Sequence, residues 1–408
     1  MKDVDFVTEE RCLRPSLRIA LVTETWAPEI NGVAMTLGRM VDGLIARGHR
    51  VQLVRPRQAL SDRAVDGPGF EEVLAHGMKI PNYDGLRFGL PARTRLFRLW
   101  SRQRPDLVHV ATEGPLGWSA VSASIRLGIP VTSDFHTNFD SYSAHYGVGW
   151  LERPVAAWLK RMHNRTAVTF VPTRVMAHDL RARGYRSVEV VARGVDTELF
   201  SPARRSAALR EAWGVAADAL AVVWVGRVAP EKNLPLVLEA FAAIRRRRPN
   251  ARLVIVGDGP LRKSLQEGNP DVVFAGARRG EDLAAHYASG DLFLFPSLSE
   301  TWGNVTLEAM ASGLCVVAYD CAAAAEVISS GCDGLLVRPG AAAAFVAESV
   351  VAASDRALRA RIAEAARRRS ESLDWERIND RFATSLQRVV DEAQAALPDF
   401  LPFKATVR

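Results

Sequence analysis

The chain has 408 residues, of which 48% are hydrophobic and 24% charged, a composition typical of a soluble globular protein. It is too long for a single hydrophobic core, so we expect two domains. Its apolar runs all fall short of the roughly 20 residues that a membrane-spanning helix needs. Residues 1–17 are polar and charged, so we expect no secretion signal and a cytoplasmic protein.

The formal net charge is +7, and almost all basic residues are arginines, since the chain has only six lysines. They are scattered and form no nucleic-acid motif, so we expect no nucleic-acid partner. A basic face toward anionic lipid headgroups, on the inner side of the cytoplasmic membrane, is the better use of this charge. Cys12, Cys315, Cys321 and Cys332 lack paired metal-ligand spacing, so we expect reduced thiols that serve packing.

The N-terminal half opens as a strand–helix–strand unit, with a strand at 17–22, a helix at 34–47 and a strand at 50–54. The first loop lacks Gly-x-Gly-x-x-Gly, so a dinucleotide fingerprint is not supported. Its end, Asn31-Gly32-Val33, can still present backbone N–H groups to a phosphate at the helix start. The alternative is an ordinary turn between strand and helix.

Two helices further along combine basic and aromatic residues. Residues 93–104 carry five arginines around Leu96, Phe97 and Trp100, and residues 150–165 repeat the theme. Such a helix either lies on a membrane or covers the core with its apolar side. The preceding segment, 61–82, contains glycine and proline, and we expect it to be irregular.

A polar loop follows the strand predicted at 131–134. It contains His136, Asn138, Asp140 and His145. Because ligands of open α/β folds collect at the carboxyl ends of strands, this loop is well placed for a binding site. The alternative for each histidine is a packing residue with a satisfied hydrogen bond.

After strands at 168–171 and 188–191, a crossover begins near Ala192 and the pattern repeats. A strand at 221–225 leads through Gly226 to a helix at 234–247. Arg227 and Lys232 flank the start of that helix, where two cations repel each other unless a polyanion lies between them. The sequence therefore predicts a diphosphate-type site here, with solvated charges as the alternative.

The strand predicted at 291–295 leads through a polar turn, with Gly303 and Asn304, into a helix that ends at 312–313. A strand–loop–helix unit of this kind directs free N–H groups and a positive dipole at an anion, usually a phosphate. Glu300 and Glu308 flank the turn. Carboxylates repel phosphate, so we expect these two to accept hydrogen bonds from sugar and ribose hydroxyls.

The pair Glu300 and Glu308, with Pro296-Ser297 before it and Ala-Met-Ala-Ser-Gly after it, resembles the donor-site signature of the retaining glycosyltransferase family 4. The resemblance covers about residues 16–394 and is more specific in the second half. It implies an α/β fold of two Rossmann-like domains facing each other across a cleft, called GT-B. The implied domains are 1–192 for the acceptor, 193–373 for the nucleotide sugar, a helix at 374–395 that packs back on the first domain, and a tail at 396–408.

The resemblance also implies roles for these residues. Arg227 and Lys232 would stabilise the leaving diphosphate, while Glu300 would hold the donor sugar and Glu308 the ribose. The implied catalytic residues are His136, Arg227, Lys232 and Glu300. The implied donor-binding residues are Asn31, Gly32, Val33, Gly226, Arg227, Lys232, Ala277, Arg278, Glu300, Thr301, Trp302, Gly303, Asn304, Val305 and Glu308. The implied acceptor-side residues are His136, Asn138, Asp140 and His145.

No Asp-x-Asp sequence lies in a loop suited to a divalent cation, so we expect no metal ion and no other cofactor. The loops Phe135-His136-Thr137 and Arg193-Gly194-Val195-Asp196 are most similar to those of bacterial GDP-mannose-dependent α-mannosyltransferases that act on lipid or glycolipid acceptors. UDP-sugar transferases that make glucosyl, glucuronosyl or sulfoquinovosyl diacylglycerol have similar loops. Another two-lobed nucleotide-sugar enzyme and a two-lobed ligand-binding protein are further alternatives.

Overall fold

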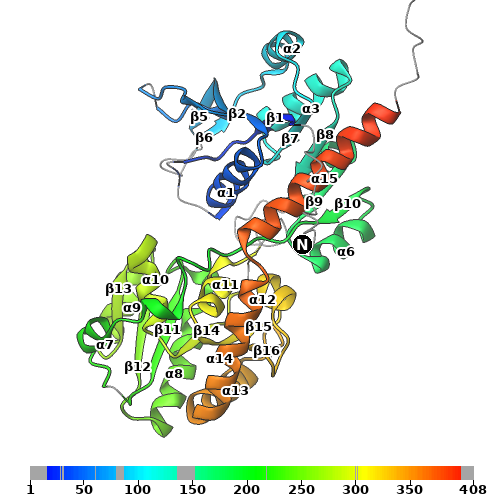
Figure 1. Cartoon of the computed structure of the whole chain (residues 1–408). Coiled ribbons are helices and arrows are strands. Elements are labelled where there is room, and N and C mark those ends of the chain that lie inside the picture. The colour runs from blue at the N-terminus through cyan, green and yellow to red at the C-terminus, as the bar shows by residue number, and fades with distance from the viewer. Residues whose placement is uncertain are drawn as a thin grey trace, which may run out of the picture.

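The computed structural model describes residues 16–27, 29, 32–59, 61–79, 87–135, 152–216, 218–298, 300 and 302–396. Two separate parallel sheets organise this part of the chain (Figure 1). The first has the order β10-β9-β8-β7-β1-β2-β4-β3, and only the β3–β4 pair is antiparallel. Its strands are β1 (Arg18–Val22), β2 (Arg50–Pro56), β3 (Asp66–Gly67), β4 (Phe70–Ala75), β7 (Leu107–Val110), β8 (Val131–Asp134), β9 (Val168–Val171) and β10 (Val188–Val190).

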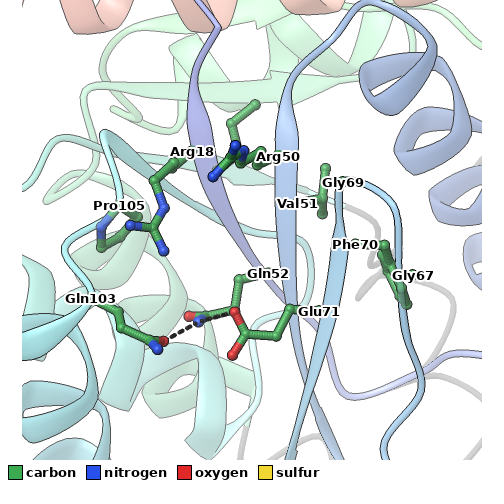
Figure 2. Close-up of a pocket in the computed structure, with 11 residues that line it drawn as sticks. Arg18, Arg50, Val51, Gln52, Gly67, Gly69, Phe70, Glu71, Gln103 and Pro105 are labelled. Atoms are coloured by element: carbon green, nitrogen blue, oxygen red, sulfur yellow. Dashed lines mark hydrogen bonds between the residues drawn. The ribbon is translucent and has the colours of Figure 1, made fainter.

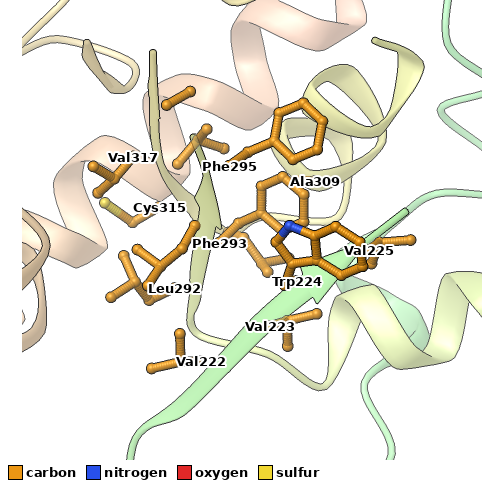
Figure 3. Close-up of a cluster of buried hydrophobic side chains, with 14 of the residues drawn as sticks. Val222, Val223, Trp224, Val225, Leu292, Phe293, Phe295, Ala309, Cys315 and Val317 are labelled. Atoms are coloured by element: carbon orange, nitrogen blue, oxygen red, sulfur yellow. The ribbon is translucent and has the colours of Figure 1, made fainter. Parts of the chain in front are cut away.

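The second sheet is parallel throughout, with the order β13-β12-β11-β14-β15-β16. Its strands are β11 (Ala221–Val225), β12 (Arg252–Val256), β13 (Val273–Gly276), β14 (Leu292–Phe295), β15 (Cys315–Tyr319) and β16 (Leu335–Val337). The central strands read as continuous apolar runs because helices cover both faces of the sheet. In Figure 3, Trp224 of β11 and Phe293 of β14 lie beside Ala309, and all three are fully buried.

Helices connect the parallel strands, as crossover connections require. Those of the first half are α1 (Gly32–Ala46), α2 (Arg93–Arg102), α3 (Pro115–Leu127), α5 (Glu152–His163) and α6 (Arg174–Ala182). Those of the second half are α7 (Ala207–Ala212), α8 (Leu234–Arg247), α9 (Arg262–Gly268), α10 (Gly280–Ala288), α11 (Asn304–Ala311), α12 (Ala322–Val327), α13 (Ala342–Ser354) and α14 (Arg356–Glu371). Short 3-10 turns η2 (Pro202–Arg204) and η3 (Pro230–Lys232) and a small hairpin, β5 (Gly77–Lys79) with β6 (Arg87–Gly89), complete the described elements. The result is the predicted pair of Rossmann-like sheets.

The last helix, α15 (Trp375–Ala395), leaves the second half and packs on α1 of the first, as predicted (Figure 1). The side chain of Asp374 caps it by accepting the backbone N–H of Glu376 at 2.7 Å. Its apolar stripe, which includes Ile378, Phe382 and Leu386, is buried in the core of the first sheet. The contact is close enough that a Cβ atom on Gly43 of α1 would lie 2.0 Å from Asn379.

The prediction that residues 61–82 are irregular is wrong, because β4 pairs with β2 along its whole length. Adjacent glutamates in Phe-Glu-Glu-Val-Leu-Ala hide the strand from a search for apolar runs. The structure accommodates the buried Glu72 by pairing it with Arg55 of β2, at 2.9 Å. Arg55 also binds Asp62 at 2.7 Å, so this arginine compensates two carboxylates.

The basic helix α2 buries its apolar side. Leu96 and Trp100 are buried in the first domain's core, so the arginines form the outer face. Of the two alternatives for this helix, the structure supports a surface helix that covers the core. In the part of the chain that the structure describes, no helix is both long and apolar enough to cross a membrane.

Candidate active site

The loops that follow β11 and β14 place the predicted charged residues at the carboxyl end of the second sheet. Lys232, at the end of η3, forms an ion pair with Glu300, and both side chains are about 15% exposed or less. The hydroxyl of Ser297 donates to the same carboxylate oxygen at 2.8 Å. A cation and a carboxylate from two different loops are thereby fixed side by side.

Arg227 lies on the same loop but pairs with Glu231, and its side chain is 65% exposed. We predicted that repulsion between Arg227 and Lys232 would demand a polyanion between them. That premise is wrong, because each cation has its own carboxylate partner. The exposed guanidinium of Arg227 is still free to turn toward a phosphate, since an exposed ion pair is worth at most about 1 kcal/mol.

The helix α11 begins in a turn that only glycine adopts easily. Gly303 caps this helix with a φ of +88°, in the left-handed region, and a Cβ atom there would lie 3.4 Å from Glu300 Cγ. The first backbone N–H groups of a helix have no partner inside it. The turn therefore directs the amino end of α11, with its positive dipole, into the space beside Glu300.

Glu308 lies one turn into α11 and is partly buried. The hydroxyl of Tyr287, on α10, donates to Glu308 Oε2 at 2.9 Å. Burial raises the pKa of this carboxyl from 4.5 to about 7, although the tyrosine hydrogen bond acts against the shift. Among the described residues, the other oxygen of Glu308 has no hydrogen-bond donor, so it can accept a ligand hydroxyl.

Two helix amino ends from opposite domains meet at this place. A Cβ atom on Gly32, the first residue of α1, would lie 4.0 Å from the side-chain nitrogen of Asn304, the first residue of α11. Both helices direct positive dipoles toward their amino ends. The arrangement suits an anion that is held from both domains at once, as a diphosphate would be.

A chain of buried polar groups lies behind the carboxyl end of β8. The ring of His109 is 3.0 Å from Thr132 Oγ1 and 3.3 Å from Asp134 Oδ2. Arg193, in the crossover between the domains, donates to Thr36 of α1 at 3.1 Å and lies near Asp134, whose charge favours the arginine cation. The crossover is thus tied to the first helix and to the strand that precedes the predicted acceptor loop.

The comparison with known proteins agrees with this geometry. A family model described as Glycosyltransferase Family 4 matches residues 30–199, and one described as Glycosyl transferases group 1 matches residues 219–355. A GDP-mannose-dependent alpha-mannosyltransferase of Corynebacterium glutamicum is 35% identical over 328 residues, which cover 80% of this chain and 77% of that protein. The chain belongs to glycosyltransferase family 4. The prediction of a glycosyltransferase enzyme is confirmed.

Two further relatives and one solved structure are also similar to this family-4 enzyme. A sulfoquinovosyl transferase of Arabidopsis thaliana is 32% identical, over 75% of this chain and 61% of that protein. A GDP-mannose-dependent alpha-(1-6)-phosphatidylinositol monomannoside mannosyltransferase of Mycobacterium tuberculosis is 30% identical, over 78% of this chain and 85% of that protein. The structure of a sucrose-phosphate synthase from Thermosynechococcus elongatus superposes with a TM-score of 0.74 at 19% identity, covering 92% of this chain and all of that one. This likeness confirms the GT-B fold.

Several predicted residues of the family-4 enzyme lie outside the described residues. They are Asn31, His136, Asn138, Asp140, His145 and Thr301. Phe135, immediately before this acceptor-side loop, is buried against Tyr185 and His163. The loop therefore starts from a fixed point at the end of β8.

Other predicted donor residues take positions that the sequence did not specify. Trp302 buries its indole in the core, so only its backbone faces the turn, where its carbonyl accepts Ala323 N–H at 2.7 Å. Val33 and Val305 likewise pack partly against the cores. Gly226 follows β11, beside the loop after β12.

Ala277 and Arg278 are exposed after the edge strand β13, where Arg278 pairs with Asp282 at 3.2 Å. Within the described part of the chain, no hydrogen bond or ion pair joins them to Lys232, Glu300 or Glu308. The structure therefore groups Arg227, Lys232, Glu300, Gly303 and Glu308. Ala277 and Arg278 lie outside this group.

The structure adds partners that we did not predict: Glu231, Ser297 and Tyr287. Glu231 and Ser297 are within four residues of the side chains they bind, so a search of the motif's neighbours would have found them. Tyr287 lies 21 positions before Glu308 on another helix, and nothing in the sequence links the two. Among the described residues, no group of three or more His, Cys, Asp or Glu side chains could hold a metal ion.

Proposed function

We propose that this glycosyltransferase transfers α-mannose from GDP-mannose to a hydroxyl of a lipid-linked or glycolipid acceptor, with retention of the anomeric configuration. The observation that supports GDP-mannose as the donor is the 35% identity to the Corynebacterium glutamicum GDP-mannose-dependent enzyme over four fifths of the chain. The meeting of α1 and α11 at Gly32 and Asn304 supports a diphosphate donor.

In this proposal the departing diphosphate lies between the two helix amino ends. Lys232, Arg227 and the first N–H groups of α11 stabilise the negative charge that develops on it. These groups can supply the positive charge that a divalent cation provides in other transferases, which is why we propose catalysis without a metal ion or other cofactor. The leaving phosphate oxygen takes the proton of the acceptor hydroxyl on the same face of the sugar.

Glu300 and Glu308 hold the two sugar rings of the donor in this scheme. Glu300 already binds Lys232 and Ser297, so the cation that faces the phosphate and the carboxylate that faces the mannose hydroxyls are positioned together. Glu308 accepts a ribose hydroxyl with the oxygen opposite Tyr287. His136 keeps its sequence-based role at the acceptor or transferred sugar, with Asn138, Asp140 and His145 nearby in the same loop.

The proposal of a lipid acceptor rests on the names of relatives and on the charge of the protein surface. The Mycobacterium tuberculosis relative is named for a phosphatidylinositol mannoside. The outer arginines of α2 and the stacked pair Trp118 of α3 and Trp158 of α5 belong to one layer of neighbouring helices in the first domain. We propose that this layer approaches the anionic inner face of the cytoplasmic membrane. Electrostatic attraction to the headgroups, rather than insertion into the bilayer, would supply most of the binding energy.

A second candidate is a UDP-sugar-dependent glycolipid synthase, which the 32% identity to the sulfoquinovosyl transferase favours. The test is to incubate the purified enzyme with vesicles of glycolipid acceptor and either GDP-mannose or UDP-sugars, with and without EDTA. We expect a mannolipid from GDP-mannose only, unaffected by EDTA, with an α linkage by NMR. A product from UDP-sugars only would establish the second candidate, and a β linkage would contradict retention.

A further inference from the structure

A second polar groove lies at the opposite end of the first sheet from the candidate active site. It encloses about 280 Å³ at the amino ends of β1, β2 and β4 (Figure 2). Its polar side chains are Arg18, Arg50, Gln52, Glu71 and Gln103. The donor site and the predicted acceptor loop lie at the carboxyl ends of the strands, so this groove belongs to neither.

Arg18 and Arg50 are register neighbours on the adjacent parallel strands β1 and β2. Adjacent strands are about 4.8 Å apart, so two like charges start close together on one face of the sheet. Within the described residues, neither guanidinium has a hydrogen bond or an ion pair. The carboxylate of the nearby Asp106 accepts the backbone N–H of Arg18 at 2.7 Å and, among the described residues, forms no ion pair with either guanidinium.

The other end of the groove carries hydrogen-bond acceptors that are held in place. Gln52 lies two residues after Arg50 and pairs with Glu71 in the register of β2 and β4, so all four side chains share a face. The indole N–H of Trp100 donates to Gln52 Oε1 at 3.0 Å, and the Gln52 amide donates to Glu71 at 3.3 Å. Figure 2 shows Gln103 joining this group from the end of α2.

The groove is therefore bipolar, with two uncompensated guanidinium groups at one end and a carboxylate with amide oxygens at the other. We propose that it binds the phosphate ester of a polyol. The phosphate would lie between Arg18 and Arg50, since one guanidinium group can bind two phosphate oxygens through parallel N–H bonds. The polyol hydroxyls donate to Glu71 and Gln103. A soluble polyol phosphate and a phospholipid headgroup both offer this chemistry.

The first test is calorimetric titration with glycerol 3-phosphate and inositol 1-phosphate. The variants are R18Q/R50Q in the groove and R246Q/R247Q, a control that removes two exposed arginines of α8 that form no ion pair within the described residues. We expect the esters to bind wild type and control at least about tenfold more tightly than R18Q/R50Q, the scale of one charge-assisted contact. Equal affinities in all three proteins would overturn the proposal, and would also show that any phosphate binding occurs elsewhere.

Glu71→Gln tests the polyol end without removing a cation. It should weaken the esters and leave inorganic phosphate unchanged. If inorganic phosphate binds wild type as tightly as the esters do, the polyol assignment is wrong. This variant also keeps the test informative if R18Q/R50Q fails to fold.

The source of the ligand follows from sedimentation with vesicles of phosphatidylcholine alone or with added phosphatidylinositol. A loss of sedimentation in R18Q/R50Q, but not in R246Q/R247Q, would identify a lipid headgroup as the ligand. Equal sedimentation of both variants, together with loss of ester binding in R18Q/R50Q, would identify a soluble phosphate. The absence of both effects would contradict the proposal.

Discussion

In the proposed mechanism, Lys232 is the buried cation that stabilises the leaving phosphate. If this proposal holds, Lys232→Ala removes that buried cation, and we expect kcat to fall by about 10²–10³, the scale for one lost charge-stabilising group. Glu300 keeps the hydrogen bond from Ser297, so the fold should survive. Turnover and thermal unfolding measured on the same preparation check both expectations.

Lys263→Ala is the matched control, because Lys263 is exposed on α9 and has no ion pair among the described residues. It should leave both kcat and stability unchanged. Equal turnover in wild type and Lys232→Ala would remove Lys232 from the mechanism.

Glu308 makes stability depend on pH, because its pKa is about 7 in the folded state against an ordinary 4.5. The raised pKa means that the folded protein holds a proton that the unfolded chain releases. The contribution to the free energy of unfolding is therefore full below about pH 4.5 and is lost as the pH rises through about 7. Between pH 5 and pH 8 this amounts to about 2–3 kcal/mol.

Glu308→Gln cannot titrate, so urea unfolding at the two pH values isolates this effect. Relative to the variant, wild type should lose about 2–3 kcal/mol between pH 5 and pH 8. Glu24, whose pKa is also raised to about 7 by burial, titrates in both proteins and cancels in the comparison. Parallel pH profiles of the two proteins would mean that Glu308 is not buried as the structure has it.

At the residue scale, the sequence predicted the charged members of the site and their loops, but not their pairing. Spacing along the chain indicates that Arg227 and Lys232 begin a helix. It does not reveal that Lys232 turns to Glu300, 68 residues away, or that the indole of Trp302 faces the core. Side-chain direction depends on packing between loops, which a linear pattern does not contain.

The short helix α12 starts with a strained residue. Ala322 has a φ of +50°, in the left-handed region that costs an L-residue about 1–2 kcal/mol. Ala322→Gly should therefore raise the free energy of unfolding by about 1 kcal/mol. Ala325→Gly, in the same helix with no positive φ, should instead lower it by about 0.5–1 kcal/mol. Chemical denaturation checks the pair, and the same sign of change in both would contradict the strain.

At the element scale, long apolar runs such as β11 and β14 were predicted within one residue because both faces of a parallel strand are buried. The strand β4 was missed for the opposite reason. Its buried Glu72 reads as a loop residue until Arg55 of β2 is placed beside it. A pattern search fails where a buried charge is compensated by another strand.

The two domains are tied together by the packing of α15 on α1, and Gly43 is the point of closest approach. Gly43→Ala would place a Cβ atom 2.0 Å from Asn379, whose side chain donates to the carbonyl of Arg39 at 3.1 Å. We expect the substitution to force the two helices apart and to destabilise the protein by about 1–3 kcal/mol, the usual cost of overpacking. Thermal unfolding measures the effect.

Gly38→Ala is the matched control on the same helix, because a Cβ atom there meets nothing within 4 Å. Alanine is the better helix former, so this variant should gain about 0.5–1 kcal/mol. A loss of stability in both variants would show that α1 resists alanine in general and that α15 is not the cause.

At the scale of the molecule, the number and type of domains could be predicted, since 408 residues with a repeated strand–helix pattern allow few other folds. The surfaces through which the two domains contact each other could not be predicted. The contact of Arg174 on α6 with Glu326 on α12, at 2.9 Å, joins the domains through single side chains. Contacts of this kind have no periodicity, so only the structure reveals that Gly32 and Asn304 face each other.

The most direct test of the proposed donor site is thermal unfolding of wild type and Lys232→Ala with GDP-mannose, UDP-glucose, GDP and UDP. A ligand at 100 times its dissociation constant adds about 2.7 kcal/mol to the stability of the folded state. We predict that GDP and GDP-mannose stabilise wild type, that the UDP compounds do not, and that Lys232→Ala loses most of the effect. No stabilisation of wild type by any nucleotide, or equal stabilisation of both proteins, would contradict the donor site described above.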